Sequence, residues 1–418
     1  MKPPACDVAI IGGGMAGLSL ALALSHQCGD DPPRITLIER HPFPQQNEPP
    51  LQPSFDARAT VLSQGSRQIY QTLGLWELLA PWATAICQIE VSSQGQFGMA
   101  HLDCREAGVE AFGHVIENRA LGHVLLAATA RHPNITLLAP AEVTALQPLA
   151  AGMRLTLTDQ SGPRQLEAAL AVIADGGRSG LREALGIAIR RRGYRQHALI
   201  ANLVTGTPHD GRAFERFTPQ GPIALLPLSE GRSALIWTLP EAEIETLMQC
   251  SEADFIARLQ RCFGLRMGLI EHVGERHHYP LERVEALEQI RAHLLLLGNA
   301  AHTLHPVAGQ SFNLSLRDTA TLAAVLQRAR QQDQPLGALS TLQDYLATRQ
   351  DDQRQTVALS HQLPRLFGQA PLWLRGGRSL GLLAFDLCLP AKQLFSRFTM
   401  GLNPPNPLRA GGHGGAGR

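Results

Sequence analysis

The chain has 418 residues, enough for two domains or for one large composite domain. Lys and Arg number 37 against 36 Asp and Glu, so no strong field favours nucleic acid, and we expect no nucleic-acid partner. The seven scattered cysteines form no CxxC pair, which argues against a disulfide framework or a zinc ribbon and favours a reducing cytoplasm. The apolar run at 8–24 carries four glycines, so we expect a buried strand, turn and helix there and no targeting segment.

The turn inside this first apolar run is a nucleotide-binding signal. Gly12, Gly14 and Gly17 form GxGxxG directly after a predicted strand and at the start of a predicted helix. This arrangement lets backbone N–H groups and the helix N-terminus approach a pyrophosphate. Glu39 ends the next predicted strand, where its carboxylate can accept hydrogen bonds from ribose hydroxyls. The motif by itself does not distinguish FAD from NAD.

A second glycine-bearing loop lies near residue 300 and points to the flavin. Gly298 ends an apolar run, and Asn299 can bond a sugar-alcohol chain. A predicted helix starts from 312, after the residues Gly309, Gln310 and Ser311. Its N-terminal N–H groups would face an electron-rich acceptor, as the flavin ring is. Asp175, with Gly176, follows another strand and by itself is equally typical of a simple turn. Loops so far apart in the chain favour one long ligand held at both ends, a flavin dinucleotide.

The predicted secondary structure changes in the middle of the chain. Strands separated by turns between 198 and 239 predict an antiparallel sheet, the usual covering layer for a substrate. We expect the apolar strand at 223–228, which contains Pro227, to form a pocket wall facing the flavin. Apolar spacing over 59–79 predicts a helix. No side chain in the sequence stands out as an acid–base catalyst.

His302 and His305 have a spacing that metal ligands can use. No third ligand with sensible spacing follows, and Pro306 indicates a shaped loop. We therefore expect no metal site and assign these histidines a structural or flavin-adjacent role.

Three segments together, GGGMAG, ADGGRSGLR and GNAAHTLHPVAGQSFNLSLRD, resemble the single-component FAD aromatic hydroxylases of the para-hydroxybenzoate hydroxylase fold. The segments DARATVLS and GRAFERFTPQGPIALLPLSEGR, with Asn299, are similar to the ubiquinone-biosynthesis branch of that family. The similarity runs over 7–402, nearly the whole chain.

The resemblance implies an α/β fold in which a Rossmann-like FAD-binding domain is interleaved with an antiparallel-sheet substrate domain and followed by a C-terminal helical region. We expect a discontinuous FAD-binding domain at 1–80, 103–185 and 275–330 and a substrate-binding sheet domain at 81–102 and 186–274. The helical region is expected at 331–402 and a disordered tail at 403–418.

The resemblance also implies roles for single residues. The residues expected to bind FAD are Gly12, Gly14, Gly17 and Glu39 at the ADP half, Arg119 near the pyrophosphate, Arg58 near the flavin, Asp175 as support of the site, Asn299 at the ribitol, Gly309, Gln310 and Ser311 at the flavin ring, and Asn313. The candidates next to the reacting part of the flavin are Arg58, Pro227, His305 and Pro306. Two positions depart from the family pattern, since Asn299 stands where most members have Asp and Ser311 where most have Gly.

The implied reaction is ring hydroxylation of a polyprenyl methoxyphenol, para to the phenol, with NAD(P)H as co-substrate and O2, through a flavin C(4a)-hydroperoxide. Three alternatives are another ring-position hydroxylase of the pathway, a related prenyl-lipid reductase and a non-catalytic flavoprotein scaffold. A discriminating observation is oxygen consumption stoichiometric with a hydroxylated phenol.

A polyprenyl substrate comes from a membrane. The segment 362–402 mixes basic residues with Leu, Phe and Trp, which is typical of an interfacial amphipathic segment and also of a packed helical layer with basic side chains at its surface. We expect a cytoplasmic enzyme, peripheral at the inner face of the cytoplasmic membrane and able to assemble with other ubiquinone-biosynthesis proteins.

Overall fold

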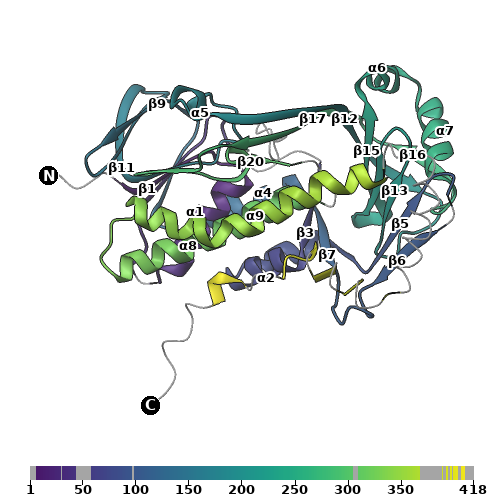
Figure 1. The fold of residues 1–418 in the computed structure, drawn as a ribbon, viewed down its shortest axis with the longest axis horizontal. Coiled ribbons are helices and arrows are strands. Elements are labelled where there is room, and N and C mark those ends of the chain that lie inside the picture. Colours follow the sequence, from purple (N-terminus) through teal and green to yellow (C-terminus); the bar gives the residue numbers. More distant parts are fainter. Residues whose placement is uncertain are drawn as a thin grey trace, which may run out of the picture.

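Two large β-sheets, a small third sheet and a layer of long helices make up the computed structural model of the chain (Figure 1). The structure describes residues 6–29, 31–43, 58–96, 98–304 and 309–367, and near the C-terminus 388, 392–393, 396–397, 399–402 and 406–409. These mixed sheets and covering helices confirm the predicted α/β fold class.

The first large sheet has four adjacent parallel strands at its centre. Their order across the sheet is β19 (Leu294–Leu296), β11 (Gly162–Ile173), β1 (Cys6–Ile11) and β2 (Ile35–Ile38). Nearly every residue of β1, β2 and β19 is buried, as expected for parallel strands that are covered on both faces. The remaining strands are β8 (Ile135–Leu138), parallel to β2, and β9 (Ala141–Leu149), β10 (Gly152–Asp159) and β18 (Ile290–Arg291), which pair antiparallel.

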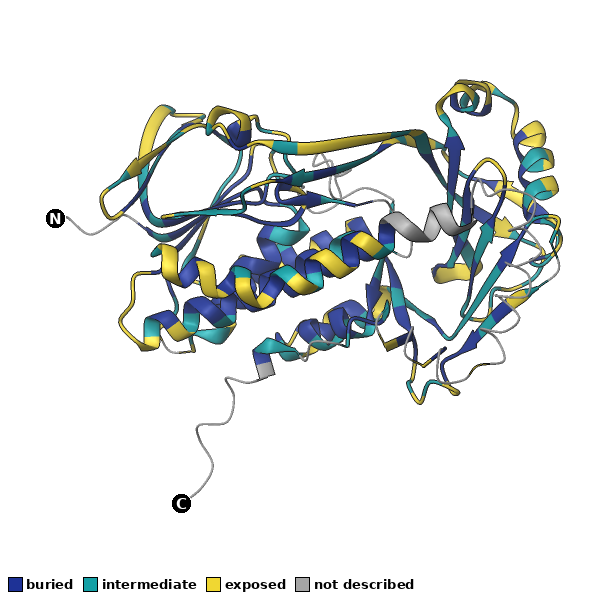
Figure 2. Ribbon diagram, viewed as in Figure 1, coloured by how far each residue is buried: buried dark blue, intermediate teal, exposed yellow. Residues whose placement is uncertain are grey.

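Helices cover one face of this sheet, and β9 and β10 pack over the other. The helices are α1 (Met15–Gln27), α4 (Asn118–Thr129), α8 (Gln310–Gln331) and α9 (Leu339–Phe367). Helix α1 packs against α8, and α8 packs against α9. Figure 2 shows α8 buried along most of its length, whereas the described part of α9 keeps an exposed face. The largest apolar core lies between these helices and the sheet and includes Ile10, Leu18 and Leu322.

The second large sheet has nine strands, and β12 (Ile189–Thr205) and β17 (His277–Ala286) run from the first region into it (Figure 1). The other strands are β5 (Gln88–Ser93), β6 (Met99–Asp103), β13 (Arg212–Phe217), β14 (Pro222–Pro227), β15 (Arg232–Pro240), β16 (Ile270–Val273) and β20 (His302–Thr303). One face packs on α6 (Glu241–Gln249) and α7 (Glu252–Phe263). Trp237, Phe214, Phe255 and Phe263 form edge-to-face aromatic pairs in that core.

A three-stranded sheet lies between these regions, and it corrects the helix predicted at 59–79. Residues Ala59–Ser63 form β3, which pairs antiparallel with β7 (Gly113–Glu117), and β7 pairs with β4 (Ala83–Ile86). Helix α2 (Gln64–Thr72) begins only after Ser63, whose hydroxyl accepts a hydrogen bond from the Ser66 N–H. The helical spacing therefore hid a short strand whose ladder partner, β7, lies far away in the chain.

Several elements cross the predicted domain boundaries, among them β17 and a part of the predicted tail. Strand β17, expected in the FAD-binding domain, pairs with β12 in the nine-stranded sheet. Within the predicted disordered tail, Pro407–Arg409 forms a short 3₁₀ helix that lies against the first region, where Gln27 Nε2 donates to Leu408 O over 3.1 Å. The other tail positions and most of 368–391 lie outside the described residues.

Candidate active site

The four central parallel strands all end at the same edge of the first sheet. Because neighbouring strands are parallel, the loops that follow them leave the sheet side by side. These loops carry Gly12 after β1, Glu39 after β2, Asp175 after β11 and Asn299 after β19. The two glycine-bearing loops, some 280 residues apart in the chain, therefore meet at one edge with the Asp-Gly loop between them.

The first loop is shaped by close backbone packing. A Cβ at Gly17 would lie 1.9 Å from the Gly12 carbonyl oxygen, so only glycine fits where α1 crosses β1. The Glu39 carboxylate accepts hydrogen bonds from Gly13 N at 2.7 Å and from His41 N at 2.9 Å. Glu39 thus holds the loop in place besides facing the cavity. Gly14, the residue before α1, provides no side-chain cap, so the first N–H groups of the helix face the cavity.

The Asp-Gly loop is organised by its own carboxylate. Asp175 accepts hydrogen bonds from Gly177 N at 2.8 Å and from the backbone and hydroxyl of Ser179. Arg182, which is 4% exposed, donates from its guanidinium to Ala300 O at 3.0 Å. This buried arginine links the Asp-Gly loop to the Gly298 loop, a connection that sequence reasoning missed because only the fold brings the two together.

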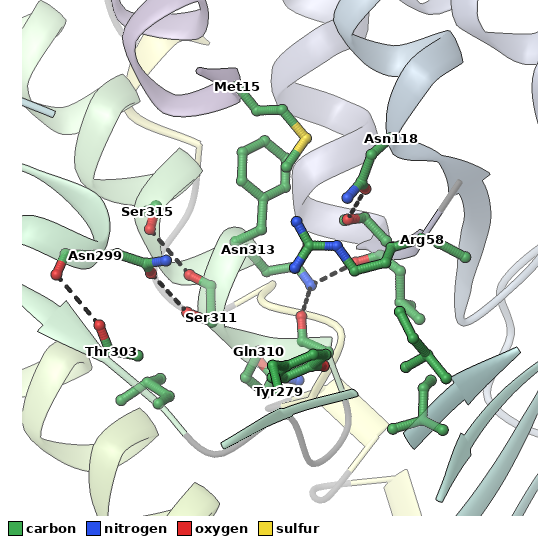
Figure 3. A pocket seen from close by; sticks show the side chains of 18 of the residues that line it. Met15, Arg58, Asn118, Tyr279, Asn299, Thr303, Gln310, Ser311, Asn313 and Ser315 are labelled. Atoms are coloured by element: carbon green, nitrogen blue, oxygen red, sulfur yellow. Dashed lines mark hydrogen bonds between the residues drawn. The ribbon is translucent and has the colours of Figure 1, made fainter. Parts of the chain in front are cut away.

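The second glycine-bearing loop ends at α8. Gly309 has φ +60°, and a Cβ there would lie 2.9 Å from Val61 Cβ. Asn299 Oδ1 accepts a hydrogen bond from Ser311 Oγ at 3.2 Å, and Figure 3 shows these two side chains with Thr303 beside the start of the helix. Ser311 lies in the first turn of α8, where φ is negative, so the serine needs no glycine-like conformation. The left-handed residue of this loop is Gly309, which is still glycine.

Asn313 joins the parts of the site together. Its amide donates to Val61 O and Gly309 O, both at 2.7 Å, and its Oδ1 accepts from Ser63 N and Ser66 Oγ. The amide is thereby fully occupied by protein partners. Asn313 lines the cavity and sets the position of β3 and α2 against α8.

Arg58 and Gln310 also lie in the predicted site. The Arg58 guanidinium lies over the Tyr279 ring, 5.8 Å from its centre, and both side chains line the cavity (Figure 3). Gln310 is buried and donates from Nε2 to Thr399 O at 3.1 Å, so the C-terminal segment reaches the start of α8.

Three predicted residues do not line the described cavity wall. Gly17 packs against the backbone of Gly12 instead. Arg119 points to Glu117, with Nε 2.5 Å from Oε2, and is absent from the described cavity wall. In β14 the wall is formed by Pro222, Ala224 and Leu226, so the alternation of the strand turns Pro227 to the other face. The predicted strand does form part of the wall, but Pro227 points to the opposite face of the sheet. His305 and Pro306 lie outside the described residues.

His302 belongs to a buried charge network. Its Nε2 lies 2.9 Å from Asp318 Oδ2, and Arg349 Nε donates to Asp318 Oδ1 at 2.6 Å. Burial alone would raise the pKa of Asp318, but Arg349 and the hydrogen bond from His302 lower it to about 2. Asp352 joins Arg349 to Arg317 and so ties α8 to α9. Across the described part of the chain, no group of three or more His, Cys, Asp or Glu side chains could hold a metal ion.

All these loops open into one cavity of about 1650 Å³. Its other wall is the nine-stranded sheet, which adds a broad apolar surface that includes Ile89, Val91, Ala224 and Ile236. Pockets for a single small ligand usually measure about 300–1,000 Å³, so this cavity has room for a dinucleotide and a second molecule. FAD fits the residues present, because uncapped N-termini of α1 and α8 and a side-chain-free glycine cradle face the same space.

One carboxylate on the sheet wall was missed by sequence reasoning. Glu215 in β13 lines the cavity, and burial raises the pKa of its carboxyl to about 7. The sequence signal is weak: Glu215 alternates with the apolar Ala213 and Phe217, its neighbours on the same face of the strand.

Comparison with known proteins agrees with this geometry. The family described as "FAD binding domain" matches residues 5–359. The chain is 37% identical to the ubiquinone hydroxylase UbiL of Rhodospirillum rubrum, over 96% of this chain and 92% of that protein. It is 30% identical to the 3-demethoxyubiquinol 3-hydroxylase of Escherichia coli, over 95% and 98% of the two chains.

Solved structures show the same fold. The p-nitrophenol 4-monooxygenase PnpA of Pseudomonas putida superimposes with a TM-score of 0.74 at 16% identity, covering 95% of this chain and 98% of that one. PqsL of Pseudomonas aeruginosa, described as a probable FAD-dependent monooxygenase, gives 0.73 at 22% identity, covering 90% and 99%. With a glycine cradle, two helix N-termini and one shared cavity, the chain belongs to the FAD-binding domain family and is an FAD-dependent aromatic hydroxylase.

Proposed function

We propose that this enzyme hydroxylates the ring of a polyprenyl methoxyphenol, para to the phenolic oxygen, as a step of ubiquinone biosynthesis, with NAD(P)H and O2 as co-substrates. The observation that carries the proposal is the single cavity with two unlike walls. One wall presents glycine loops and helix N-termini, and the facing wall is an apolar sheet surface. The similarity to the Rhodospirillum rubrum ubiquinone hydroxylase over nearly the whole chain supports the same pathway.

FAD, when bound, supplies the acceptance of hydride from NAD(P)H and the activation of O2. The protein supplies binding and orientation. The N-termini of α1 and α8 would face the pyrophosphate and the flavin ring, and Asn299 would meet the sugar-alcohol chain between them. The apolar sheet wall excludes water from the ring that is to be hydroxylated.

The apolar wall also matches the substrate class. Val91, Ala224 and Ile236 lie in one row across the sheet and give the cavity wall apolar surface against which an aromatic ring can pack. A phenol carries its highest electron density ortho and para to its oxygen, and hydroxylation at the para carbon yields a benzoquinol. The polyprenyl tail is also apolar, so the part of it next to the ring favours an apolar cavity wall.

A second candidate is hydroxylation at another ring position of the same pathway. The Escherichia coli relative is named for hydroxylation at position 3, and it matches over 95% of this chain. The substrate would differ in ring substituents and not in the reaction.

The test supplies purified holoenzyme with NADH or NADPH, O2 and either 2-geranyl-6-methoxyphenol or a 3-demethoxyubiquinol of the same tail length. We expect mass spectrometry to show one added oxygen on the methoxyphenol, and oxygen consumption to equal product formed. Product from the demethoxyubiquinol alone would overturn the para assignment. NAD(P)H oxidation without any hydroxylated product would overturn ring hydroxylation itself. Complementation of strains that each lack one ring hydroxylase gives the independent check.

We also propose that the enzyme collects its substrate at a membrane surface, with 362–402 as the contact and with other ubiquinone-biosynthesis proteins as neighbours. Most of this segment lies outside the described residues, and no described helix is long and apolar enough to cross a membrane. Five basic residues against one acidic residue in 362–402 support contact with anionic lipid. Flotation with anionic liposomes should recover the full chain, and the triple variant Arg365→Glu, Arg375→Glu, Arg378→Glu should stay behind. Equal flotation of both proteins contradicts the contact.

A further inference from the structure

Glu215 lies in a row of residues that crosses the cavity wall from strand to strand. Its direct neighbours are Val91 in β5 and Ala224 in β14, and Ala224 in turn pairs with Ile236 in β15. All four side chains line the cavity. Along β13 the residues on the same face are Ala213 and Phe217, which also line it. Glu215 is therefore a single carboxylate surrounded on the sheet by apolar side chains.

Charged residues close to Glu215 in sequence and register point the other way. Arg216 donates from Nε to Cys262 O in α7, at 2.9 Å, on the opposite face of the sheet. Glu90, the neighbour of Val91, is paired on that same face with Arg266, whose Nε lies 2.5 Å from Oε1. The alternation of the strands thus separates Glu215 from both the cation and the anion beside it.

The other carboxylates of the described cavity wall all have partners. Glu39 and Asp175 accept backbone hydrogen bonds from their own loops, as shown above. The remaining three lie within 4 Å of a nitrogen of a basic side chain, Glu142 of Arg40, Glu275 of His277 and Glu282 of Arg191. Among the described residues, Glu215 alone of this set has neither a hydrogen bond nor an ion pair to the protein.

A carboxyl group without a partner in an apolar wall destabilises the folded protein when it is ionised. Apolar residues of similar size would pack there without that cost. The arrangement points to a partner that arrives with a ligand, and the ligand must offer a hydrogen-bond donor to a carboxylate. A phenol offers such a donor on an otherwise apolar ring, which matches the apolar surroundings of Glu215 on the sheet.

We propose that the Glu215 carboxylate accepts a hydrogen bond from the phenolic hydroxyl of the substrate and takes its proton during ring hydroxylation. This assignment of a catalytic residue rests on the proposed function. The raised pKa of Glu215 supports it, since a more basic carboxylate lies nearer to the pKa of a phenol, about 10 for the tyrosine phenol.

The step balances as follows. The phenol O–H bond breaks, its proton moves to Glu215, and the electron pair left on oxygen raises the electron density at the ortho and para carbons. One atom of O2 forms the new ring C–O bond as a hydroxyl, and the other leaves as water. NAD(P)H supplies two electrons as hydride, and the three hydrogens of the hydroxyl and the water are that hydride, one proton from solvent and the hydrogen that the ring carbon loses. The hydroxylated carbon then loses its hydrogen as a proton while Glu215 returns its proton to the original oxygen. The product is an aromatic ring with two hydroxyl groups.

The experiment compares the wild-type holoenzyme with Glu215→Gln, Glu215→Leu and the matched control Glu90→Gln. Glu90 is one strand away and faces the opposite side of the sheet. The probes are 2-geranyl-6-methoxyphenol and its methyl ether, which lacks the donated hydrogen. Binding is read from the change in absorbance of the bound flavin, and product from mass spectrometry. Flavin content and circular dichroism verify that each variant is folded.

We expect Glu215→Gln to bind the phenol within about threefold of wild type, because an amide oxygen still accepts the hydrogen bond. Its hydroxylation rate should fall about 100-fold, since the amide cannot take the proton. Glu215→Leu should bind the phenol about tenfold more weakly and lose the preference for the phenol over the methyl ether. Glu90→Gln should behave like wild type in both measurements.

Two results would overturn the assignment: hydroxylation by Glu215→Gln at the wild-type rate, or an unchanged phenol preference in Glu215→Leu. Failure of the proposed function looks different. In that case the wild type binds the phenol in preference to its ether, Glu215→Leu loses the preference, and no protein forms hydroxylated product. That outcome would support Glu215 as the hydrogen-bond acceptor for a phenol and would contradict ring hydroxylation as the reaction.

Discussion

The two walls of the cavity differ in how their polar groups are hydrogen-bonded. On the nucleotide side, backbone N–H groups and paired charges dominate, and Glu39, Asp175 and Asn313 are each engaged by several protein hydrogen bonds. On the sheet side the lining is largely apolar, and Glu215 stands without a described protein partner. On the nucleotide side, protein partners hold the polar side chains, and the N–H groups at the starts of α1 and α8 are left for a ligand. On the sheet side, one carboxylate is left without a described partner.

Because of this difference, substitutions in the two walls should have different effects. On the nucleotide side, glycines make tight backbone contacts and the loop side chains are held in hydrogen-bond networks, so substitutions there should cost stability or cofactor. A wall of apolar side chains with one carboxylate should lose substrate affinity or rate first, with the fold and the cofactor retained. The four predictions below separate these outcomes, from the largest expected effect to the smallest.

The buried charge network between α8 and α9 should show the largest effect. Arg349→Met leaves Asp318 buried without its cation, and we expect the free energy of unfolding to fall by about 3–5 kcal/mol. The control is Arg354→Met in the exposed pair with Asp351, which should cost less than about 1 kcal/mol. Urea unfolding of the holoprotein measures both. Equal losses in the two variants would contradict the importance of burial here.

The glycine cradle comes next. In Gly17→Ala the new methyl group would lie 1.9 Å from the Gly12 carbonyl oxygen, so α1 must move away from β1. We expect FAD affinity to drop about 100-fold, or roughly 3 kcal/mol. Titration of the apoprotein with FAD, followed by flavin fluorescence, gives the affinity. Gly193→Ala, where a Cβ meets open space, should bind FAD normally.

On the apolar wall we expect a smaller and more selective effect. Ala224→Leu places a larger side chain beside Glu215, and the dissociation constant of 2-geranyl-6-methoxyphenol should rise about tenfold with FAD affinity unchanged. Ile223→Val changes the opposite face of the same strand and should lower stability by about 1 kcal/mol without altering that constant. A weakened FAD affinity in Ala224→Leu would show that the two walls are not separable.

The pH dependence of stability should carry the signature of Glu215. Burial raises the pKa of Glu215 in the folded protein to about 7, above the ordinary value of 4.5, so the folded state binds more protons than the unfolded state between these values. Its contribution to stability therefore falls as pH rises from about 4.5 to about 7. Glu215→Gln should remove this fall and be more stable than wild type at pH 8 by about 1 kcal/mol or more. Urea unfolding at pH 5 and pH 8 measures the free energy of unfolding of both proteins. If the advantage of Glu215→Gln over wild type does not grow from pH 5 to pH 8, the Glu215 carboxyl is not desolvated.

Local patterns were sufficient for much of the nucleotide side. A glycine-rich turn between an apolar strand and a helix has few structural solutions, so Gly12, Gly14, Gly17 and Glu39 could be placed from the sequence. The glycine at 309 before a helix indicated the second helix N-terminus in the same way. These predictions depend on contacts between residues close in sequence or on one repeated βα unit.

Predictions that depended on side-chain direction were less successful. Pro227 was chosen from a strand that does form the wall, but a shift of one residue turns a side chain to the other face of a sheet. Arg119 is paired with Glu117 and does not line the described cavity wall. Residues 59–63 form a strand because β7, more than 50 residues later, provides the hydrogen bonds. The spacing of apolar residues over 59–79 does not indicate a pairing strand so far away in the chain.

By itself the sequence determined that two nucleotide-type loops exist and that an antiparallel sheet lies between them in the chain, because helix and strand periodicity and glycine turns are local properties. Only the tertiary structure decided that the loops open into one cavity, that Arg182 joins two of them, and that Glu215 faces the apolar side without a partner among the described residues. Strand register and sheet packing set those relations, and both arise from contacts between residues far apart in the chain.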